Sequence, residues 1–252
     1  MFSEIYTVGS GMIQQMQRQE LIAENLAGSN LSGFKGRHLV GSKFAQLMAD
    51  ATGDSPAISD ETVIPPVVVT DLEQGGLKPT ERALDFALIG KGFFEVVTAD
   101  DQVLLTRNGN FMLNGDGALV TQEGHRVQGS GGDIRFVITD SVQNTRASED
   151  GTISVLNSDG SERQLGKLRI VQMAQPERLE RLSANYYVVP DDMELTDAQE
   201  AQVVNGYQEG ANVSPIREMA AMIQSVREFE MGQKILQMIS DRSRQEQQKL
   251  QA

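Results

Sequence analysis

The sequence predicts an α+β protein in which two long terminal helices, paired in the manner of a coiled coil, flank an antiparallel β-domain. Apolar residues recur at steps of three and four near both ends, whereas short apolar runs separated by Gly, Asn and Asp fill the middle. We expect an N-terminal helix with a following motif at 1–35, an irregular linker at 36–76 and a β-domain at 77–195. Residues 196–252 are then a connector and a long helix, which forms an inner helical domain with 1–35.

The C-terminal helix is predicted to run from Ser214 to about Leu250. Ser214 suits the N-cap, Pro215 the first helical position and Glu218 the first turn. A helix of this length is a rod on the order of 50 Å long. Its apolar stripe, which has one polar member at Gln233, contains Met219, Met222, Ile223, Val226, Phe229 and Leu236. The stripe is wider than one partner helix covers, so we expect more than one neighbour.

The N-terminal helix is predicted from Ser3 to about Asn25, and its sequence runs out at Gly28. Its stripe follows the same spacing through Ile5, Val8, Met12, Gln15, Gln19, Ile22 and Leu26. Two glutamines on this stripe weaken a two-stranded coil and favour a helix that meets several neighbours. The alternative is that both terminal helices pack on a globular core of their own chain.

The region between the helices is predicted to be mainly β-structure. A short helix at 44–51 and a strand at 67–70 are expected in the linker. Strand-like runs, each bounded by turn residues, then follow at 86–89, 93–97, 103–106, 111–113, 118–121, 126–128, 134–138, 152–156, 167–171 and 186–189. The last of these is expected to be the final strand, with a connector from 191 to 213.

The composition excludes several classes of function. A formal net charge of −13 argues against a nucleic-acid partner, and no stretch approaches the roughly 20 apolar residues that a spanning helix needs. The chain has no Cys and only two His, His38 and His125, which leaves little material for thiolate chemistry or a zinc site. The N-terminus lacks the basic lead and apolar run of a secretion signal. We therefore expect no catalytic residues, no metal or other cofactor and no membrane insertion.

Individual polar residues have structural interpretations. The segments 114–117 and 157–160 lack the later acidic ligands of a calcium loop, so we interpret them as hairpin turns. Asp85 lies among apolar residues, and we prefer a turn carboxylate that accepts backbone N–H bonds over a buried acid. Arg107 is expected in a structural or interface ion pair rather than at a substrate site.

Three blocks of sequence resemble the rod and hook axial proteins of the bacterial flagellar basal body. Residues 22–35 contain Asn-Leu-Ala and end in Gly-Phe-Lys, and residues 84–94 read Leu-Asp-Phe-Ala-Leu-Ile-Gly-Lys-Gly-Phe-Phe. Residues 210–213 read Gly-Ala-Asn-Val and precede Glu218 and Met219. The blocks stand in the family's order. The length of the chain and its short 40–75 region are more similar to the proximal rod protein than to the distal one.

The resemblance implies a structural subunit, not an enzyme, that assembles into a hollow helical shaft, transmits torque and lines the export channel. Its implied partners are other rod and hook-basal-body proteins, further copies of itself and the type III export apparatus. Its implied location is the periplasmic rod, reached without a cleaved signal peptide. The stripe residues listed above, except the glutamines, are expected at the assembly interface, together with Asn25, Asn30, Phe34 and Asn212.

Two other interpretations remain open on the residues alone. One is a secreted surface or adhesin-like β-protein that oligomerises through its terminal helices, although such a protein is expected to carry a signal peptide. The other is an enzyme with a site on the loops of the β-domain, using Asp85 or Asp100, although two His and no convergent acid–base set weigh against it.

Overall fold

A computed structural model of the chain describes residues 2–40, 66–137, 140–157, 160–190 and 192–250. The chain divides into two compact units. Unit 1 contains residues 1–27, 37–71 and 214–252, and unit 2 contains residues 28–36 and 72–213.

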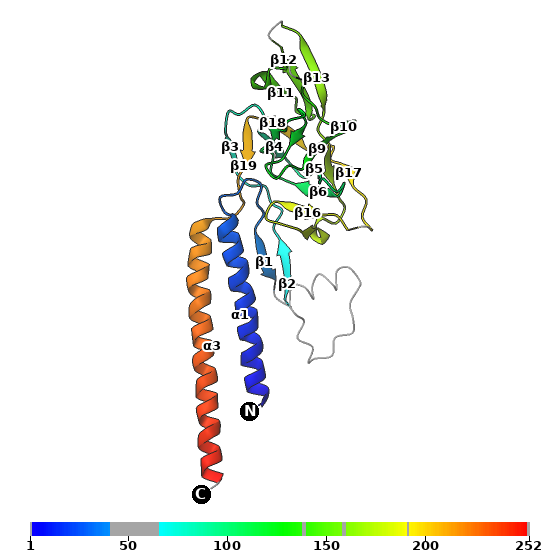
Figure 1. The fold of residues 1–252 in the computed structure, drawn as a ribbon. Helices are drawn as coiled ribbons and strands as arrows, with labels where there is room; N and C mark the ends of the chain where they lie inside the picture. The colour runs from blue at the N-terminus through cyan, green and yellow to red at the C-terminus, as the bar shows by residue number, and fades with distance from the viewer. Residues whose placement is uncertain (1, 41–65, 138–139, 158–159, 191, 251–252) are drawn as a thin grey trace. The chain divides into compact units, whose positions relative to one another are not determined.

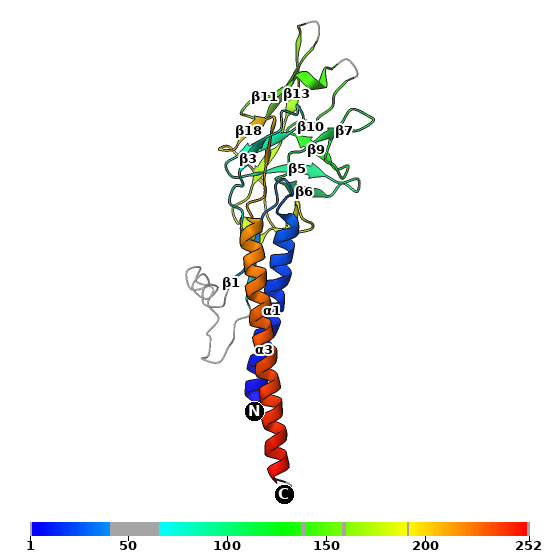
Figure 2. The ribbon, with the colours of Figure 1, turned by 90° about the vertical axis from the view of Figure 1, so that its left-hand side faces the viewer.

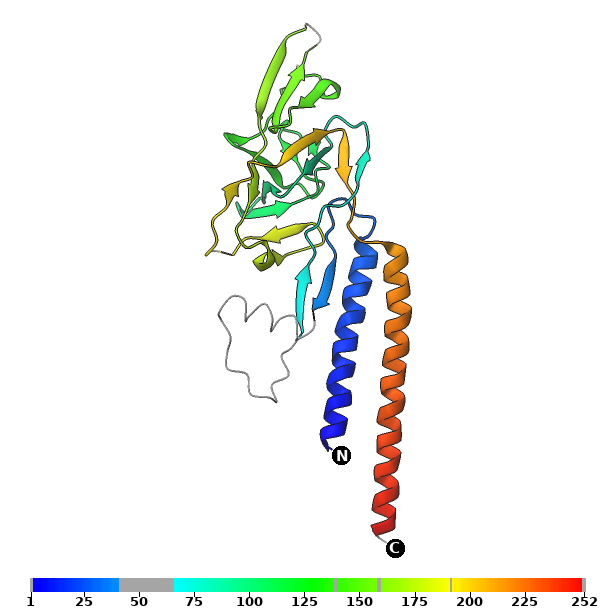
Figure 3. The same cartoon turned by 180° about the vertical axis from the view of Figure 1, so that it is seen from behind.

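Unit 1 contains the two terminal helices, α1 (Phe2–Gly28) and α3 (Pro215–Leu250). The helices run antiparallel, because Gln19 contacts Ser225 whereas Met12, two turns nearer the N-terminus, approaches Gly232. Their opposite courses are visible in Figure 1 and, from behind, in Figure 3. Both predicted helices are confirmed. Within the described residues, neither helix has a stretch apolar and long enough to cross a membrane.

A two-stranded hairpin completes the described part of unit 1. Strand β1 (Arg37–Val40) pairs antiparallel with β2 (Val67–Thr70), in a register that sets Arg37 opposite Thr70. The predicted strand at 67–70 is confirmed. Its partner was missed, because β1 lies inside the segment that we expected to be an irregular linker. The predicted helix at 44–51 lies outside the described residues.

Unit 2 is built from antiparallel strands, which confirms the predicted β-rich domain (Figure 2). Its largest sheet has ten strands in the described chain, with the order β15-β16-β6-β5-β9-β8-β7; β10 pairs with β9, and β14 pairs with β5 and β17. The bounds of these strands are β5 Phe93–Val97, β6 Val103–Thr106, β7 Met112–Leu113, β8 Leu119–Val120, β9 Arg126–Gly129, β10 Gly132–Asp133, β14 Ile170–Gln172, β15 Glu180–Arg181, β16 Tyr186–Val188 and β17 Thr196–Asp197.

Unit 2 also contains smaller sheets. A three-stranded sheet contains β11 (Thr145–Ala147), β12 (Thr152–Leu156) and β13 (Glu162–Lys167). Two further pairs join distant parts of the chain: β18 with β4, and β19 with β3. Their bounds are β3 Leu77–Pro79, β4 Phe86–Ile89, β18 Gln202–Asn205 and β19 Tyr207–Glu209. Short 3₁₀ turns lie at Val142–Asn144 and Pro176–Arg178.

The large sheet is buried on both faces, which explains its unbroken apolar runs. On β5, Phe94 belongs to one apolar cluster and Phe93 to a second, because successive side chains of a strand point to opposite faces. The first cluster includes Phe111, whose ring centroid is 5.4 Å from that of Phe94. The second includes Tyr187, whose ring centroid is 5.6 Å from that of Phe93.

Two predictions about strands are wrong. The expected strand at 134–138 is only an isolated bridge between Ala118 and Arg135 in the described residues. The expected connector at 191–213 contains β17, β18 and β19, and Tyr186–Val188 is not the final strand. Strands β18 and β19 pair with β4 and β3, and these contacts, more than 110 residues apart in the chain, offer no local sequence signal.

Candidate assembly interface

Glutamine side chains join α1 to α3 within unit 1. The amide nitrogen of Gln15 donates to the hydroxyl and carbonyl oxygens of Ser225, at 2.7 and 3.1 Å, and to Glu228 Oε2 at 2.9 Å. Gln19 Nε2 donates to the same Ser225 carbonyl at 3.2 Å. Ser225 is buried. The two polar positions of the predicted α1 stripe therefore lie on the side that contacts α3.

Small residues on α3 provide the opposite side of this contact. A Cβ added to Gly232 would lie 3.0 Å from Met12 Cγ, so Met12 packs closely over the glycine. Ser225 and Gly232 are seven residues apart and share one helix face. The predicted α3 stripe ran instead through Val226 and Gln233, one residue further along. The sequence signal that was missed is this pair of small residues, because only apolar side chains were counted.

A different face of α3, away from Ser225 and Gly232, is apolar and exposed. Ile216, Met219 and Ile223 are 80, 53 and 57% exposed, and Val226 is also exposed. Their spacing of three, four and three residues forms one stripe along three turns. On α1, Ile13 and Met16 are exposed as well. By contrast, the remaining predicted α3 residues are only partly exposed: Met222, Phe229 and Leu236.

The predicted interface residues of α1 have mixed environments. Ile22 is buried, whereas Val8, Met12 and Leu26 are partly exposed. The side chain of Ile5 lies outside the described side chains.

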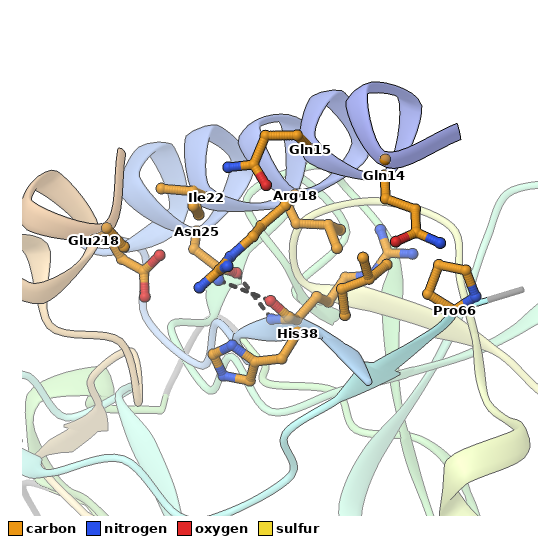
Figure 4. Close-up of a pocket in the computed structure, with 13 residues that line it drawn as sticks. Gln14, Gln15, Arg18, Ile22, Asn25, His38, Pro66 and Glu218 are labelled. Carbon is orange, nitrogen blue, oxygen red and sulfur yellow. Dashed lines mark hydrogen bonds between the residues drawn. The ribbon is translucent and has the colours of Figure 1, made fainter. Parts of the chain in front are cut away.

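A pocket of about 440 Å³ with a mixed polar and apolar lining lies beside α1, β1 and the start of α3 (Figure 4). Its lining includes Asn25, which is buried and holds β1 through two bonds: Asn25 Nδ2 donates to the Arg37 carbonyl at 2.9 Å, and Arg37 N donates to Asn25 Oδ1 at 2.8 Å. Arg18, His38 and Glu218 also line it. The guanidinium of Arg37 pairs with Glu24 at 3.0 Å. Asn25, which we expected at an interface, thus fixes the hairpin to the helix of its own chain.

The remaining predicted interface residues belong to unit 2. Phe34 is buried under the guanidinium of Arg181, 4.6 Å from its ring centroid. Asn212 Oδ1 accepts a bond from Gly36 N at 2.8 Å. Asn30 is exposed and lines a different pocket. Phe34 and Asn212 therefore have partners within the subunit, and their place in an assembly stays a prediction.

The chemistry-bearing residues singled out in the sequence have structural roles. Arg107 pairs with Glu209 at 3.4 Å, which confirms the predicted ion pair. Asp85 is fully buried; its Oδ2 accepts a bond from the Gln208 side chain at 2.8 Å, so the preferred interpretation as a turn carboxylate is wrong.

Asn114 Oδ1 accepts bonds from the amides of Asp116 and Ala118 at the β7–β8 turn, as predicted. In the described chain, no group of three or more Asp, Glu or His is arranged to hold a metal ion.

Comparisons with known proteins agree with this architecture. Residues 87–155 match the family model of the flagellar hook protein FlgE/F/G D1 domain, and residues 204–248 match that of the flagellar basal body rod FlgEFG protein C-terminal region. The chain is 31% identical to the flagellar basal-body rod protein FlgF of Escherichia coli and 30% identical to that of Salmonella typhimurium. Each of these alignments covers 94% of both chains. It is 27% identical to the rod protein FlgG of Agrobacterium fabrum, over 90% of this chain and 91% of that protein.

These matches extend over nearly the whole chain and do not support an adhesin-like protein. The chain belongs to the family of flagellar basal-body rod proteins, which are structural subunits and not enzymes.

Proposed function

We propose that the chain assembles with other axial proteins of the basal body, and with further copies of itself, into a hollow helical shaft that transmits torque and lines the export channel. Repeated contacts between different surfaces of identical or related subunits produce such open helical arrays. We also propose that the chain reaches the periplasmic rod through the type III export apparatus without a cleaved signal peptide. The family membership and the exposed helix faces support this proposal.

The observation that carries it is the exposed stripe of Ile216, Met219, Ile223 and Val226 on α3. A contiguous apolar surface on a subunit marks an interaction site, because its exposure to water is unfavourable. The stripe runs along one face over three turns, and its spacing suits a neighbouring helix. Since the Ser225 side of α3 already contacts α1, the stripe remains for another subunit.

We further propose that α1 and α3 pair in a coiled-coil-like manner inside the assembly. The contacts at Met12, Gln15 and Gln19 follow the spacing of three and four residues that such a seam requires. The polar seam weakens the isolated pair, and neighbouring helices on the exposed faces stabilise it.

The choice between rod subtypes stays a prediction. The length of the chain favours the proximal type. Separately, the relatives named FlgF are 30 and 31% identical to this chain. Those named FlgG reach 26 to 28%, over similar shares of the chain.

A charge on the exposed stripe tests the proposal. In Ile223→Asp, a carboxylate enters an interface that is apolar, which costs several kcal/mol if the site is dry. We expect the variant to melt like the parent protein, to be absent from isolated basal bodies and to leave cells non-motile. Ala220→Asp is the matched control, because it places the same carboxylate at an exposed position of α3 that does not belong to the stripe. Motile cells whose rods contain only Ile223→Asp would show that the stripe is not an assembly surface.

A further inference from the structure

Three Asn-Gly dipeptides occur in the chain, at 108–109, 114–115 and 205–206. In such a pair the main-chain nitrogen of the glycine can attack the side-chain amide carbon of the asparagine, because the glycine has no side chain to obstruct the approach. The reaction needs a glycine nitrogen that donates no hydrogen bond, an asparagine Nδ2 that is able to leave, and room for the main chain to close a ring. All three dipeptides lie in unit 2, and the structure gives them different surroundings.

The dipeptide at 205–206 is blocked at both reacting groups. The Gly206 nitrogen donates to the carbonyl oxygen of Asp85 at 2.8 Å. Removing its proton would leave a negative nitrogen beside a carbonyl oxygen, which is unfavourable. Asn205 Nδ2 donates to the carbonyl oxygens of Ala83 at 2.8 Å and Asp85 at 3.4 Å. Neither the nucleophile nor the leaving group is therefore available.

The dipeptide at 108–109 is blocked by packing. Asn108 is buried, and its Oδ1 accepts a bond from Asn110 N at 3.1 Å. A Cβ added to Gly109 would lie 1.7 Å from the Phe86 carbonyl oxygen and 3.1 Å from Phe94 Cε2. The Gly109 carbonyl oxygen also accepts a bond from Phe86 N at 2.9 Å. The main chain at Gly109 therefore has no room to move toward the asparagine side chain.

The dipeptide at 114–115 meets every requirement. Asn114 and Gly115 are exposed, and a Cβ added to Gly115 would have no atom within 4 Å. In the part of the chain that the structure describes, neither the Gly115 nitrogen nor Asn114 Nδ2 donates a hydrogen bond. The dipeptide lies in the turn between β7 and β8, and β7 is the end strand of the ten-stranded sheet.

The side-chain oxygen of Asn114 adds an electrostatic contribution. Asn114 Oδ1 accepts bonds from Asp116 N at 3.0 Å and from Ala118 N at 2.9 Å. Negative charge develops on this oxygen when a nucleophile attacks Cγ, and main-chain N–H donors at such distances stabilise that charge. The turn therefore activates the amide of Asn114 toward attack.

We propose that Asn114 is a site of spontaneous modification: the folded subunit converts it, through a cyclic imide with Gly115, to aspartate or isoaspartate. The Gly115 nitrogen gives up its proton and bonds to Asn114 Cγ, the bond from Cγ to Nδ2 breaks, and Nδ2 leaves with that proton as ammonia. One water molecule then opens the ring at either carbonyl carbon. Both products carry a new carboxylate in the β7–β8 turn, and isoaspartate also routes the main chain through Cβ.

Incubation of the purified full-length protein, followed by digestion and mass spectrometry, tests this proposal. We expect position 114 to be converted at least about tenfold faster than positions 108 and 205, because donors on the reacting oxygen have effects of this size or larger. Isoaspartate should be among the products at 114, because direct hydrolysis of the side-chain amide gives aspartate alone. In denaturant the three positions should react at similar rates, because the unfolded chain removes the bonds and the packing that distinguish them.

Gly115→Ala tests whether the Gly115 nitrogen is the nucleophile. The position has room for a Cβ and its φ is not positive, so the variant should melt like the parent protein. Conversion at 114 should fall at least about tenfold, because a side chain that displaces the reacting atoms has an effect of this size or larger. Gly131→Ala is the matched control: it also adds a Cβ in open space and should leave conversion at 114 unchanged. Equal conversion at the three positions of the folded protein would overturn the proposal, as would undiminished conversion at 114 in Gly115→Ala.

Discussion

Strand β5 and the first three turns of α3 are similarly rich in apolar residues, but those of β5 are buried and several of those of α3 are exposed. Phe93, Phe94 and Val96 of β5 are buried between two clusters of the same unit. Ile216 and Ile223 of α3 are largely exposed, although they are equally apolar. Unit 2 therefore buries its apolar residues within one chain, whereas α3 leaves an apolar face exposed, which we propose is covered by another subunit. Apolar content alone does not distinguish these two uses.

The polar contacts differ in the same direction. In unit 2, Glu209, Lys35 and Asp85 are buried with partners from the same unit. In unit 1, the contacts between the helices pass through Gln15 and Gln19, side chains that lie at the edge of water. A partly hydrated glutamine seam contributes less to stability than a packed core, so the helix pair is expected to be the weaker region.

The largest effect is expected in the core of unit 2. Phe111→Ala removes a fully buried ring that contacts Phe86 and Phe94, and the cavity should destabilise unit 2 by about 3–5 kcal/mol. Thermal unfolding followed by the β-sheet circular dichroism signal measures the loss. The control Leu182→Ala, at an exposed position, should change stability by less than about 0.5 kcal/mol. Equal melting of the two variants would contradict a core around Phe111.

A smaller and more local effect is expected at the helix seam. Gln15→Leu removes three donated bonds and leaves the buried Ser225 hydroxyl without its 2.7 Å donor, at a cost of about 1–2 kcal/mol. Amide exchange should rise along the Ser225 region of α3, while the melt of unit 2 stays unchanged. Gln17→Leu, at an exposed position of the same helix, should leave both measurements unchanged. A lowered melt of unit 2 in Gln15→Leu would mean that the seam supports the β-sheet.

The smallest effect is expected at Glu95 of β5. Burial raises the pKa of Glu95, Arg169 at 3.1 Å opposes the shift and Asp197 adds to it. The pKa of Glu95 is therefore higher in the folded protein than in the unfolded chain. For such a group, the contribution to folding stability is fully present below the pKa of the unfolded chain and is lost as the pH rises through the pKa of the folded protein. Glu95→Gln should therefore be slightly more stable than the parent protein at pH 8 and equal to it near pH 4. Thermal melts at both pH values check this, with the exposed Glu162→Gln as control. A variant that is less stable at pH 8 would show that the pair with Arg169 outweighs burial.

Much of the fold was predictable because its signals are local. The caps at Ser214 and Pro215 and the spacing of apolar residues predicted α3, and the apolar run at 93–97 predicted a strand. Strands β18 and β19 escaped prediction because Gln202–Asn205 and Tyr207–Glu209 are short and largely polar, and their partners are distant in the chain.

The candidate interface was predictable only in part. Periodicity identified the exposed residues Met219, Ile223 and Val226, but it placed the α1 contact at apolar positions, whereas the contact is made by Ser225 and Gly232. Periodic patterns reveal a face of a helix, not the partner that covers it. The pair of Lys35 and Glu209 joins residues 174 positions apart, and nothing in the sequence connects them.

The most direct test of the account asks whether the exposed stripe of α3, which contains Ile223, is covered in the assembled rod. The chain contains no cysteine, so Ile223→Cys places a single thiol on the stripe. We predict that a maleimide reagent modifies position 223 in the purified protein but not in isolated basal bodies, and that denaturing the basal bodies restores the reaction. Equal modification in intact and denatured basal bodies would contradict the claim that this face of α3 is an assembly surface.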